Sequence, residues 1–307
     1  MQEGEIIGQG IEPIDIVATR SPRSSRRSGD PYGGSVIAMG TMHGKEHQLA
    51  PVFAAELGAQ VVAPAGIDTD QFGTFAGEVT RMHTPQAAAS AKARLAMDTA
   101  KVPYGLASEA SYNTWYGTLV MHEEILLFID DTRGIEVVEG VNTPGAPGSP
   151  QLVDGVSKAA AAVRAFGFPA QGALVKAIVE GDVRVFGKGI TDMATLTKVV
   201  EAALAAADAH QVWVEPDLRA HHNPSRREVL TTLARRLAQR LATTCPACQC
   251  PGHGKIAVNT GLPCQACGCP TSLIAADVYG CASCAQRDVI ARAADAAEPR
   301  FCPRCNP

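Results

Sequence analysis

The segment SVIAMGTMHGKEHQLAPVFAAEL, residues 35–57, contains the pair of elements that decides the fold. Its first five residues are a short apolar run that ends at Gly40, and residues 46–57 have helix-like periodicity. A buried strand that leads directly into a helix is the repeating unit of α/β folds. The segment therefore predicts a sheet with helices packed on its faces.

The same alternation continues on both sides of this segment. Strands are predicted near 60–63, 104–107, 125–129, 135–138, 173–178, 183–186 and 211–214, and helices near 85–98, 152–166, 193–207 and 224–242. Pro85 and Pro224 each stand at a predicted first helical turn, where proline is favoured. The order of elements predicts an α/β fold with a mixed sheet flanked by helices, followed by a small C-terminal double zinc ribbon.

Composition divides the chain into three parts. Residues 1–33 are rich in Arg and Ser and poor in apolar side chains, which predicts a disordered leader. Residues 34–243 form the α/β domain, and the turn-rich segment NTPGAPGSPQ (142–151) is expected to join two lobes of it. Residues 244–307 form the ribbon domain. Of the 307 residues, 46% are hydrophobic and the net charge is −4, which argues against a surface that coats nucleic acid.

Four Cys-x-x-Cys pairs occupy the last part of the chain. They are Cys245/Cys248, Cys264/Cys267, Cys281/Cys284 and Cys302/Cys305. Two such pairs complete a tetrahedral four-cysteine shell, so the sequence predicts two structural Zn²⁺ ions. The first two pairs are separated by 15 residues and the last two by 17, so loop closure favours sequential pairing. Interleaved pairing, first with third and second with fourth, needs gaps above 30 residues and stays open.

Two other interpretations of the cysteines are less favoured. The opening MQEGEIIGQG has no secretory signal pattern, so we expect a cytoplasmic protein with reduced thiols rather than a disulfide framework. Four consecutive copies do not suit a redox Cys-x-x-Cys site. Cys250 and Cys269 are left over and are not expected to bind metal. No stretch of eighteen apolar residues exists, so no membrane partner is expected.

The turn between the first strand and the first helix is the best place for chemistry. Free backbone N–H groups at a strand–helix turn favour an anion such as phosphate. Lys45 adds a positive charge, and Thr41 and His43 add polar groups beside it. An ordinary strand–helix turn would look similar. The interpretation becomes stronger if acidic side chains for a metal ion lie nearby.

Carboxylates follow several of the predicted strands. Asp68, Asp70 and Glu78 lie in a Gly-rich loop, and Glu109 follows the strand expected at 104–107. Asp130 and Asp131 end another strand, and for any single one of these side chains other than Glu78 and Glu109 a role in capping a helix or turn is favoured. Ligands of open α/β sheets bind beyond the carboxyl ends of strands. Glu78 and Glu109 are therefore candidates to bind Mg²⁺ or to activate water.

A second basic group stands where the last long helix begins. Asn223 is suited to cap this helix, and Arg219, His221 and Arg226 cluster around its start. A capping role needs neither arginine nor histidine, so the cluster favours anion recognition over a capped helix with solvated charges. Lys188, in FGKGI, is a weaker candidate of the same kind.

The segments GTMHGKE, VVAPAGIDTDQFGTFAGEVTR, AAASAKARLA and YGLASEASY together resemble the inosine/xanthosine triphosphate pyrophosphatase superfamily. The resemblance covers roughly residues 36–131. It implies that Thr41 and Lys45 hold phosphate, that Glu78 and Glu109 are the acidic metal and base positions, and that Lys92 and Arg94 contact the substrate. His43 stands where the superfamily has asparagine.

Almost everything after the leader resembles an uncharacterised bacterial family. The motifs that carry this resemblance are MHGKE, DTDQFGTFAGE, GLASE, DLRAHHNPSR and the C-terminal double zinc ribbon. It implies the architecture but supplies no activity.

Two classes of function follow from these patterns. The first is a metal-assisted hydrolase or binding protein for a nucleotide or related phosphorylated small molecule, resembling a nucleoside triphosphate pyrophosphatase. The second is a zinc-ribbon module that binds nucleic acid or protein, or an inactive nucleotide sensor. The ribbon has few cations and no run of base-stacking aromatic residues, which disfavours nucleic acid. The sequence leaves a homodimer open.

Overall fold

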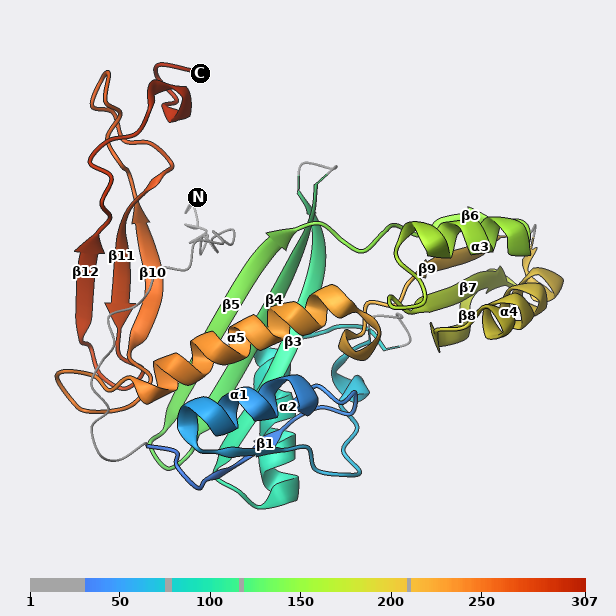
Figure 1. The fold of residues 1–307 in the computed structure, drawn as a ribbon, viewed down its shortest axis with the longest axis horizontal. Helices are drawn as coiled ribbons and strands as arrows, with labels where there is room; N and C mark the ends of the chain where they lie inside the picture. The colour runs from blue at the N-terminus through green and yellow to red at the C-terminus, as the bar shows by residue number, and fades with distance from the viewer. Residues whose placement is uncertain (1–30, 75–78, 116–118, 209–210) are drawn as a thin grey trace, which may run out of the picture.

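A computed structural model describes residues 31–74, 79–115, 119–208 and 211–307. All but the last three residues of the expected leader lie outside these ranges, as does Glu78. The described residues form three sheets, which divide the chain into a first lobe, a second lobe and a projecting finger (Figure 1). No helix in the described ranges is both long and apolar enough to span a membrane.

The first lobe is built on a five-stranded mixed sheet with the order β2-β1-β3-β4-β5. Its strands are β1 (Val36–Met39), β2 (Gln60–Val62), β3 (Tyr104–Trp115), β4 (Leu119–Asp130) and β5 (Ile135–Pro144). The first three are parallel, and β3, β4 and β5 are antiparallel neighbours. The predicted mixed α/β class is confirmed.

Strands β3 and β4 are much longer than the short strands that the sequence predicted. They pair without interruption from Tyr104 opposite Asp130 to Trp115 opposite Leu119. The polar residues beyond 107 continue the strand because the partner strand satisfies their backbone groups. Glu109 was expected to follow a strand. It lies instead within β3, opposite Ile125.

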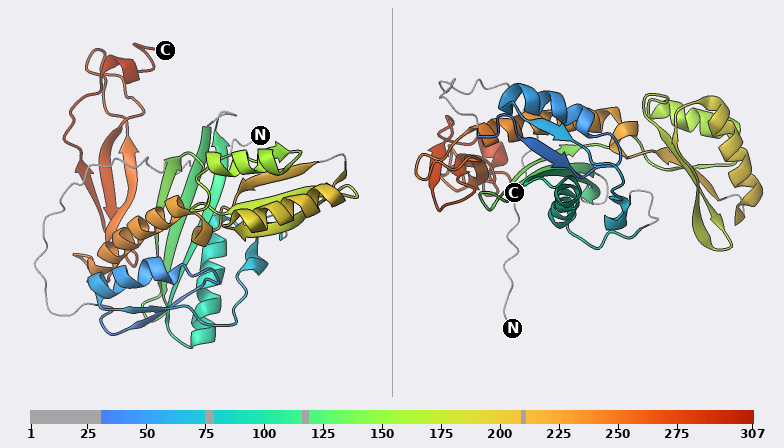
Figure 2. Two further views of the ribbon diagram at one scale, coloured as in Figure 1. Left: turned by 45° about the vertical axis from the view of Figure 1, so that its right-hand side comes forward. Right: turned by 90° about the horizontal axis from the view of Figure 1, so that it is seen from below.

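Three helices cover this sheet. Helices α1 (Glu46–Leu57) and α5 (Pro224–Ala242) lie on one face, and α2 (Pro85–Ala100) lies on the other (Figure 2). The core on the first face joins Phe53 of α1 and Leu237 of α5 to Phe128 of the sheet. Tyr32, which the sequence placed in the leader, is fully buried in this core and its hydroxyl donates a hydrogen bond to Asp130.

The second lobe is a four-stranded antiparallel sheet, β6-β9-β7-β8, with two helices. Its elements are β6 (Gln151–Val153), α3 (Val156–Ala165), β7 (Ala173–Val179), β8 (Asp182–Ile190), α4 (Met193–Ala206) and β9 (Val212–Pro216). The helix predicted at 152–166 begins later because residues 151–153 pair with β9. This lobe has a hydrophobic core of its own.

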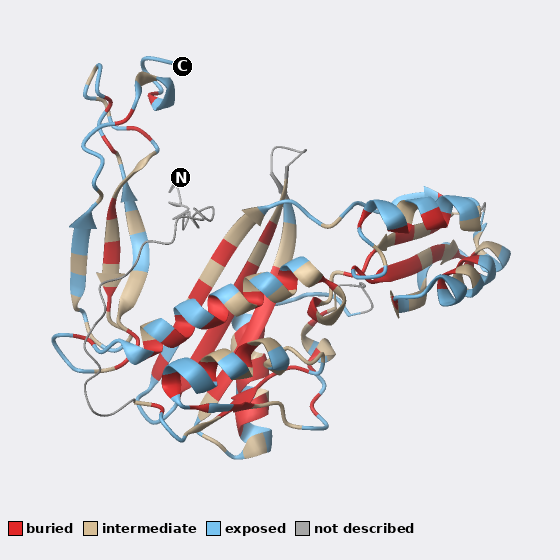
Figure 3. Cartoon of the chain, in the orientation of Figure 1, coloured by how far each residue is buried: buried red, intermediate tan, exposed pale blue. Residues whose placement is uncertain are grey.

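The finger is a three-stranded antiparallel meander of β10 (Gly254–Thr260), β11 (Ile274–Gly280) and β12 (Arg287–Ala291). Most of it is exposed, in contrast to the sheet of the first lobe (Figure 3). Its base is held by Arg240 near the end of α5. This side chain donates hydrogen bonds to the carbonyl oxygens of Gly252 and Val138 and to Glu139.

Candidate functional site

A narrow cavity lies where the first lobe meets the second. About 40 Å³ of it is available to the centres of water molecules. Its walls come from the β1–α1 loop, the loop after β2, helix α2, strand β3, strand β8 and the segment that leads into α5. Of the residues singled out in the sequence, those that line it are Thr41, His43, Lys45, Asp70, Lys92, Glu109, Lys188, Arg219 and Arg226.

The β1–α1 loop forms one wall of the cavity. Gly40 is needed there because a Cβ atom would collide with the carbonyl oxygen of Lys92 in α2. The Thr41 hydroxyl accepts a hydrogen bond from the His43 backbone N–H at 3.1 Å, and His43 Nε2 lies 3.3 Å from Oδ1 of Asp70. Burial lowers the pKa of His43 despite this neighbouring carboxylate. His43 is therefore neutral at pH 7 and contributes polarity rather than charge.

Lys45 enters the cavity without a carboxylate partner. Its Nζ donates hydrogen bonds to the backbone oxygen of Ser108 at 3.2 Å and to the Ser108 hydroxyl at 3.0 Å, and it forms no ion pair with any described residue. Burial, together with the nearby Arg226 guanidinium, lowers the pKa of the Lys45 amine to about 8. Glu124 and Glu109 favour its charged form from beyond ion-pair distance, so an anion in the cavity would be its first directly contacting counter-charge among the described groups.

Glu109 is held between two cations. Its Oε2 accepts a hydrogen bond from Lys92 Nζ at 2.5 Å, and its Oε1 lies 3.7 Å from Arg81 Nη2. Arg81 also donates a hydrogen bond to the Ala110 carbonyl at 2.7 Å. Both Lys92 and Glu109 are buried. The carboxylate is thus neutralised from two sides.

Arg226 is fixed in the interior at the start of α5. Its Nε and Nη2 donate hydrogen bonds to Glu124 at 2.7 and 2.9 Å, and its Nη1 donates to the Leu218 carbonyl at 2.6 Å. His122 Nε2 lies 3.1 Å from the same carboxylate. Burial raises the pKa of Glu124, but Arg226 and His122 outweigh it and lower that pKa to about 2. Glu124 is therefore ionised and orients Arg226.

Asp217 orients Arg219 as Glu124 orients Arg226. Its Oδ2 accepts hydrogen bonds from Arg219 Nη2 at 2.6 Å and from the Gly189 backbone N–H at 2.8 Å. Gly189 directly follows Lys188 in β8. One carboxylate therefore joins the second lobe to a cation that lines the cavity.

Contacts between histidine rings connect the β1–α1 loop to the segment before α5. The rings of His43 and His221 are stacked with centroids 4.8 Å apart, and the rings of His221 and His222 have centroids 4.0 Å apart. Burial, together with His222 and His43, lowers the pKa of His221 to about 4. His221 contacts the site through His43 and does not line the cavity.

The described side chains that line the cavity include more cations than carboxylates. Six cations line it: Lys45, Arg81, Lys92, Lys188, Arg219 and Arg226. Asp70 and Glu109 line it as well. Glu124 and Asp217 lie outside its lining and form ion pairs with Arg226 and Arg219. Among these described side chains, cations therefore outnumber carboxylates, which favours an anionic ligand.

Some expected side chains lie elsewhere. Arg94 is on the outer surface of α2, where its Nη1 lies 3.3 Å from Asp131 and both side chains are about half exposed. Asp130 and Asp131 lie at the opposite end of the sheet because β4 runs antiparallel to β3. Arg81 and Glu124 were not predicted from the sequence. The sequence feature that could have singled out Glu124 is its position as a carboxylate next to the apolar run of β4.

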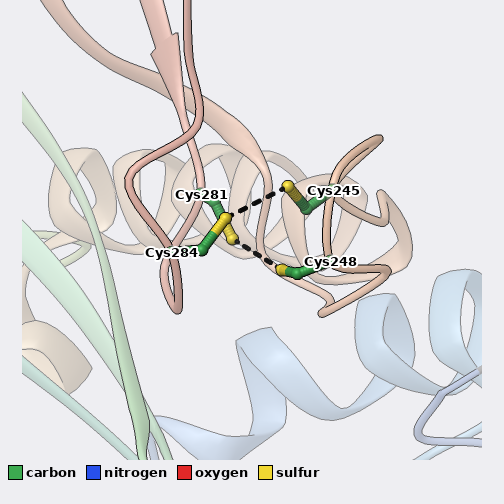
Figure 4. A group of neighbouring side chains, drawn as sticks. All are labelled: Cys245, Cys248, Cys281 and Cys284. Carbon is green, nitrogen blue, oxygen red and sulfur yellow. Dashed lines mark hydrogen bonds between the residues drawn. The ribbon is translucent and has the colours of Figure 1, made fainter.

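The eight expected cysteines form two groups of four, but the predicted pairing was wrong. One group is Cys245, Cys248, Cys281 and Cys284 (Figure 4), and the other is Cys264, Cys267, Cys302 and Cys305. This is the interleaved order. Each strand of the meander carries the chain from one end of the finger to the other. The first and third pairs therefore meet at the base, and the second and fourth pairs meet at the tip.

The spacing of the sulfur atoms fits a metal ion better than a disulfide. Cys245–Cys284 and Cys248–Cys281 sulfurs are 3.7 and 3.5 Å apart, and those at the tip are 3.9 and 3.6 Å apart. A tetrahedron with Zn–S bonds of about 2.3 Å has S–S edges of about 3.8 Å. A disulfide has an S–S bond of about 2.05 Å. Each group can therefore hold one structural metal ion.

A family model places this architecture among known sequences. Residues 92–307, more than half of the chain, match the model described as a domain of unknown function (DUF6671). The chain belongs to the DUF6671 family. The match to this family begins at Lys92 and includes Glu109, Arg226 and all eight metal-site cysteines. The expected membership of an uncharacterised family is confirmed, and the comparison gives no support to the pyrophosphatase resemblance.

Other comparisons add little to the DUF6671 assignment. No curated protein matches the sequence. A dodecamer of a single-residue variant of PelC from Paraburkholderia phytofirmans is 14% identical, with 36% of this chain and 70% of that chain covered and a TM-score of 0.19. The PelC dodecamer from the same organism is 13% identical, with 61% and 94% covered and a TM-score of 0.17. At these scores the likeness carries no argument.

Proposed function

We propose that the cavity between the lobes binds the phosphoryl group of a small molecule of the nucleotide class. The observation that carries this proposal is Lys45, whose ammonium group lies in the interior with hydrogen bonds but no ion pair to a described residue. The six cations among the described side chains that line the cavity support an anionic ligand such as a phosphoryl group. The nucleotide itself is an expectation from the sequence, and the contacts in the cavity support only its phosphate.

A more specific proposal is that the protein hydrolyses its ligand with the help of a metal ion. The contacts of Glu109 test whether this side chain could bind that ion. Mg²⁺ needs carboxylate oxygens with free lone pairs. Lys92 and Arg81 already approach both oxygens of Glu109, so a metal ion there would have to displace Lys92. These contacts favour anion binding over a metal-assisted reaction at Glu109.

A titration with phosphate tests the binding proposal. We expect inorganic phosphate to bind the wild-type protein in calorimetry, and Lys45→Met to weaken binding at least about tenfold through loss of a charge-assisted hydrogen bond. Lys198→Met, which changes an exposed lysine on α4, is the matched control and should bind like wild type. Equal affinity for phosphate in the Lys45 and Lys198 variants would contradict the proposal.

Turnover is measured separately. Nucleoside triphosphates with Mg²⁺ are incubated with wild type and with Glu109→Gln. A hydrolase that uses Glu109 loses its rate in the variant. A binding protein shows no turnover in either protein, but binds phosphate more tightly in the variant because Lys92 loses its carboxylate partner.

We also propose that both cysteine groups hold zinc and that the finger is a scaffold. The finger has few buried apolar residues, so metal binding and its folding should be coupled. Lys255 and Arg292 both contact Asp277, which reduces the positive charge that a nucleic-acid partner would require. A protein partner suits this surface better than nucleic acid.

A further inference from the structure

Lys188 is held in place on both sides by glycines that pack tightly. A Cβ atom at Gly187 would lie 2.9 Å from Val199 in α4, and one at Gly189 would collide with the His222 ring. Gly189 also has a φ of +69°, which disfavours other residues. The sequence FGKGI therefore anchors the backbone around a lysine whose own side chain is exposed at the cavity.

The joint between the second lobe and the segment before α5 is made by short backbone hydrogen bonds. The Gly172 N–H donates to the His222 carbonyl at 2.8 Å, and the Asp217 N–H donates to the Gly172 carbonyl at 2.7 Å. Asp217 also accepts from the Gly189 N–H. The second lobe thus holds Lys188 in a defined position relative to Arg219, which the same Asp217 orients.

The two lysines that enter the cavity differ in depth. Lys45 is hydrogen-bonded in the interior, whereas Lys188 is exposed and reaches the cavity from the opposite lobe. About 40 Å³ of the cavity is available to the centres of water molecules, and Lys188 lies on its exposed side. A second phosphoryl group next to one bound at Lys45 would extend toward Lys188 and Arg219, which also line the cavity.

We propose that Lys188 and Arg219 form a second anion subsite and that the preferred ligand carries two adjacent phosphoryl groups. The first group binds at Lys45 and the second binds between Lys188 and Arg219, so that both lobes hold one ligand. This inference rests on the proposed function. It adds the substrate class, a diphosphate, and gives the second lobe a role in recognition.

The test compares inorganic phosphate and pyrophosphate as probes. Affinities are measured by calorimetry at constant ionic strength for wild type, Lys188→Ala and Lys198→Ala. Lys198 is the matched control because it is an exposed lysine of the same lobe that does not line the cavity. We expect wild type to bind pyrophosphate at least about tenfold more tightly than phosphate. Lys188→Ala should remove most of this preference and leave phosphate affinity within about twofold.

Each outcome separates the two proposals. If wild type binds neither probe, the proposed function fails. If wild type binds both but Lys188→Ala keeps the wild-type preference, or weakens both probes equally, only the second subsite is overturned. A Lys198→Ala variant that also loses the preference would show a general charge effect and overturn it too. Thermal unfolding of Lys188→Ala and Lys188→Gln verifies that both remain folded.

Discussion

The guanidinium of Arg226 and the carboxylate of Glu124 form two hydrogen bonds, of 2.7 and 2.9 Å, with both side chains essentially inaccessible to solvent. They come from residues 102 apart in sequence, one at the start of α5 and one in β4. The pair joins helix to sheet directly beside the cavity. It therefore serves both stability and the orientation of a cation.

Breaking this pair should be costly. Glu124→Gln removes the carboxylate that forms two hydrogen bonds with the buried Arg226 guanidinium, so we expect a loss of about 3–5 kcal/mol in the free energy of unfolding. The pair of Lys158 and Asp154, with side chains 65% and 64% exposed, is the control, and Asp154→Asn should cost less than about 1 kcal/mol. Urea denaturation measures both. Similar losses for the two variants would contradict the role given to burial.

Phosphate affinity should fall at alkaline pH. The amine of Lys45 has a pKa lowered to about 8, so it is protonated below that pH and neutral above it. An anion binds better when the Lys45 amine is protonated. Above pH 8 the amine must therefore take up a proton on binding, and the affinity for phosphate falls by up to about tenfold per pH unit. Lys45→Arg keeps its charge and should shift this loss to higher pH. An unchanged profile in the variant would assign the titration to another group.

Metal analysis of double variants distinguishes the two pairing orders. In the interleaved order Cys245→Ser with Cys281→Ser damages one group, so the protein should keep about one zinc per chain. In the sequential order the same substitutions would damage both groups. Cys245→Ser with Cys264→Ser reverses the expectation. Cys250→Ser, outside both groups, should retain both ions.

Gly40→Ala should destabilise the first lobe. Its Cβ would collide with the Lys92 carbonyl, so β1 and α2 would have to separate, at an expected cost of about 1–3 kcal/mol. Gly155→Ala, where nothing lies within 4 Å of the added atom, is the control. Because Lys92 is displaced, phosphate affinity should fall in the Gly40 variant alone. Thermal unfolding and calorimetry on the same samples test both effects.

Local signals predicted the helices well. Asn223 caps α5 through the Arg226 N–H and Thr84 caps α2 through the Ala87 N–H, with proline at the following position in each. These capping interactions involve neighbouring residues, so sequence alone contains them. The turn between β1 and α1 was likewise predictable, because it depends on one short segment.

Long-range relationships were not predictable in the same way. The cysteine pairing depends on three strands that act as spacers, and an extended strand of seven residues spans roughly 23 Å. That length keeps consecutive Cys-x-x-Cys pairs at opposite ends of the finger. Loop-closure entropy alone would favour consecutive pairs in the same metal site. The role of Glu124 was hidden for a similar reason. Its partner Arg226 lies beyond the entire second lobe in sequence.

Helix α5 has the cavity at one end and the base of the finger at the other. Arg226 lies in its first turn, and Cys245 follows three residues after its last. Nineteen helical residues make a rod of roughly 28 Å. A rigid-body tilt of this helix moves both of its ends together. A shift of the metal group at its far end would move Arg226, and a ligand that fixes Arg226 would steady the metal group in return.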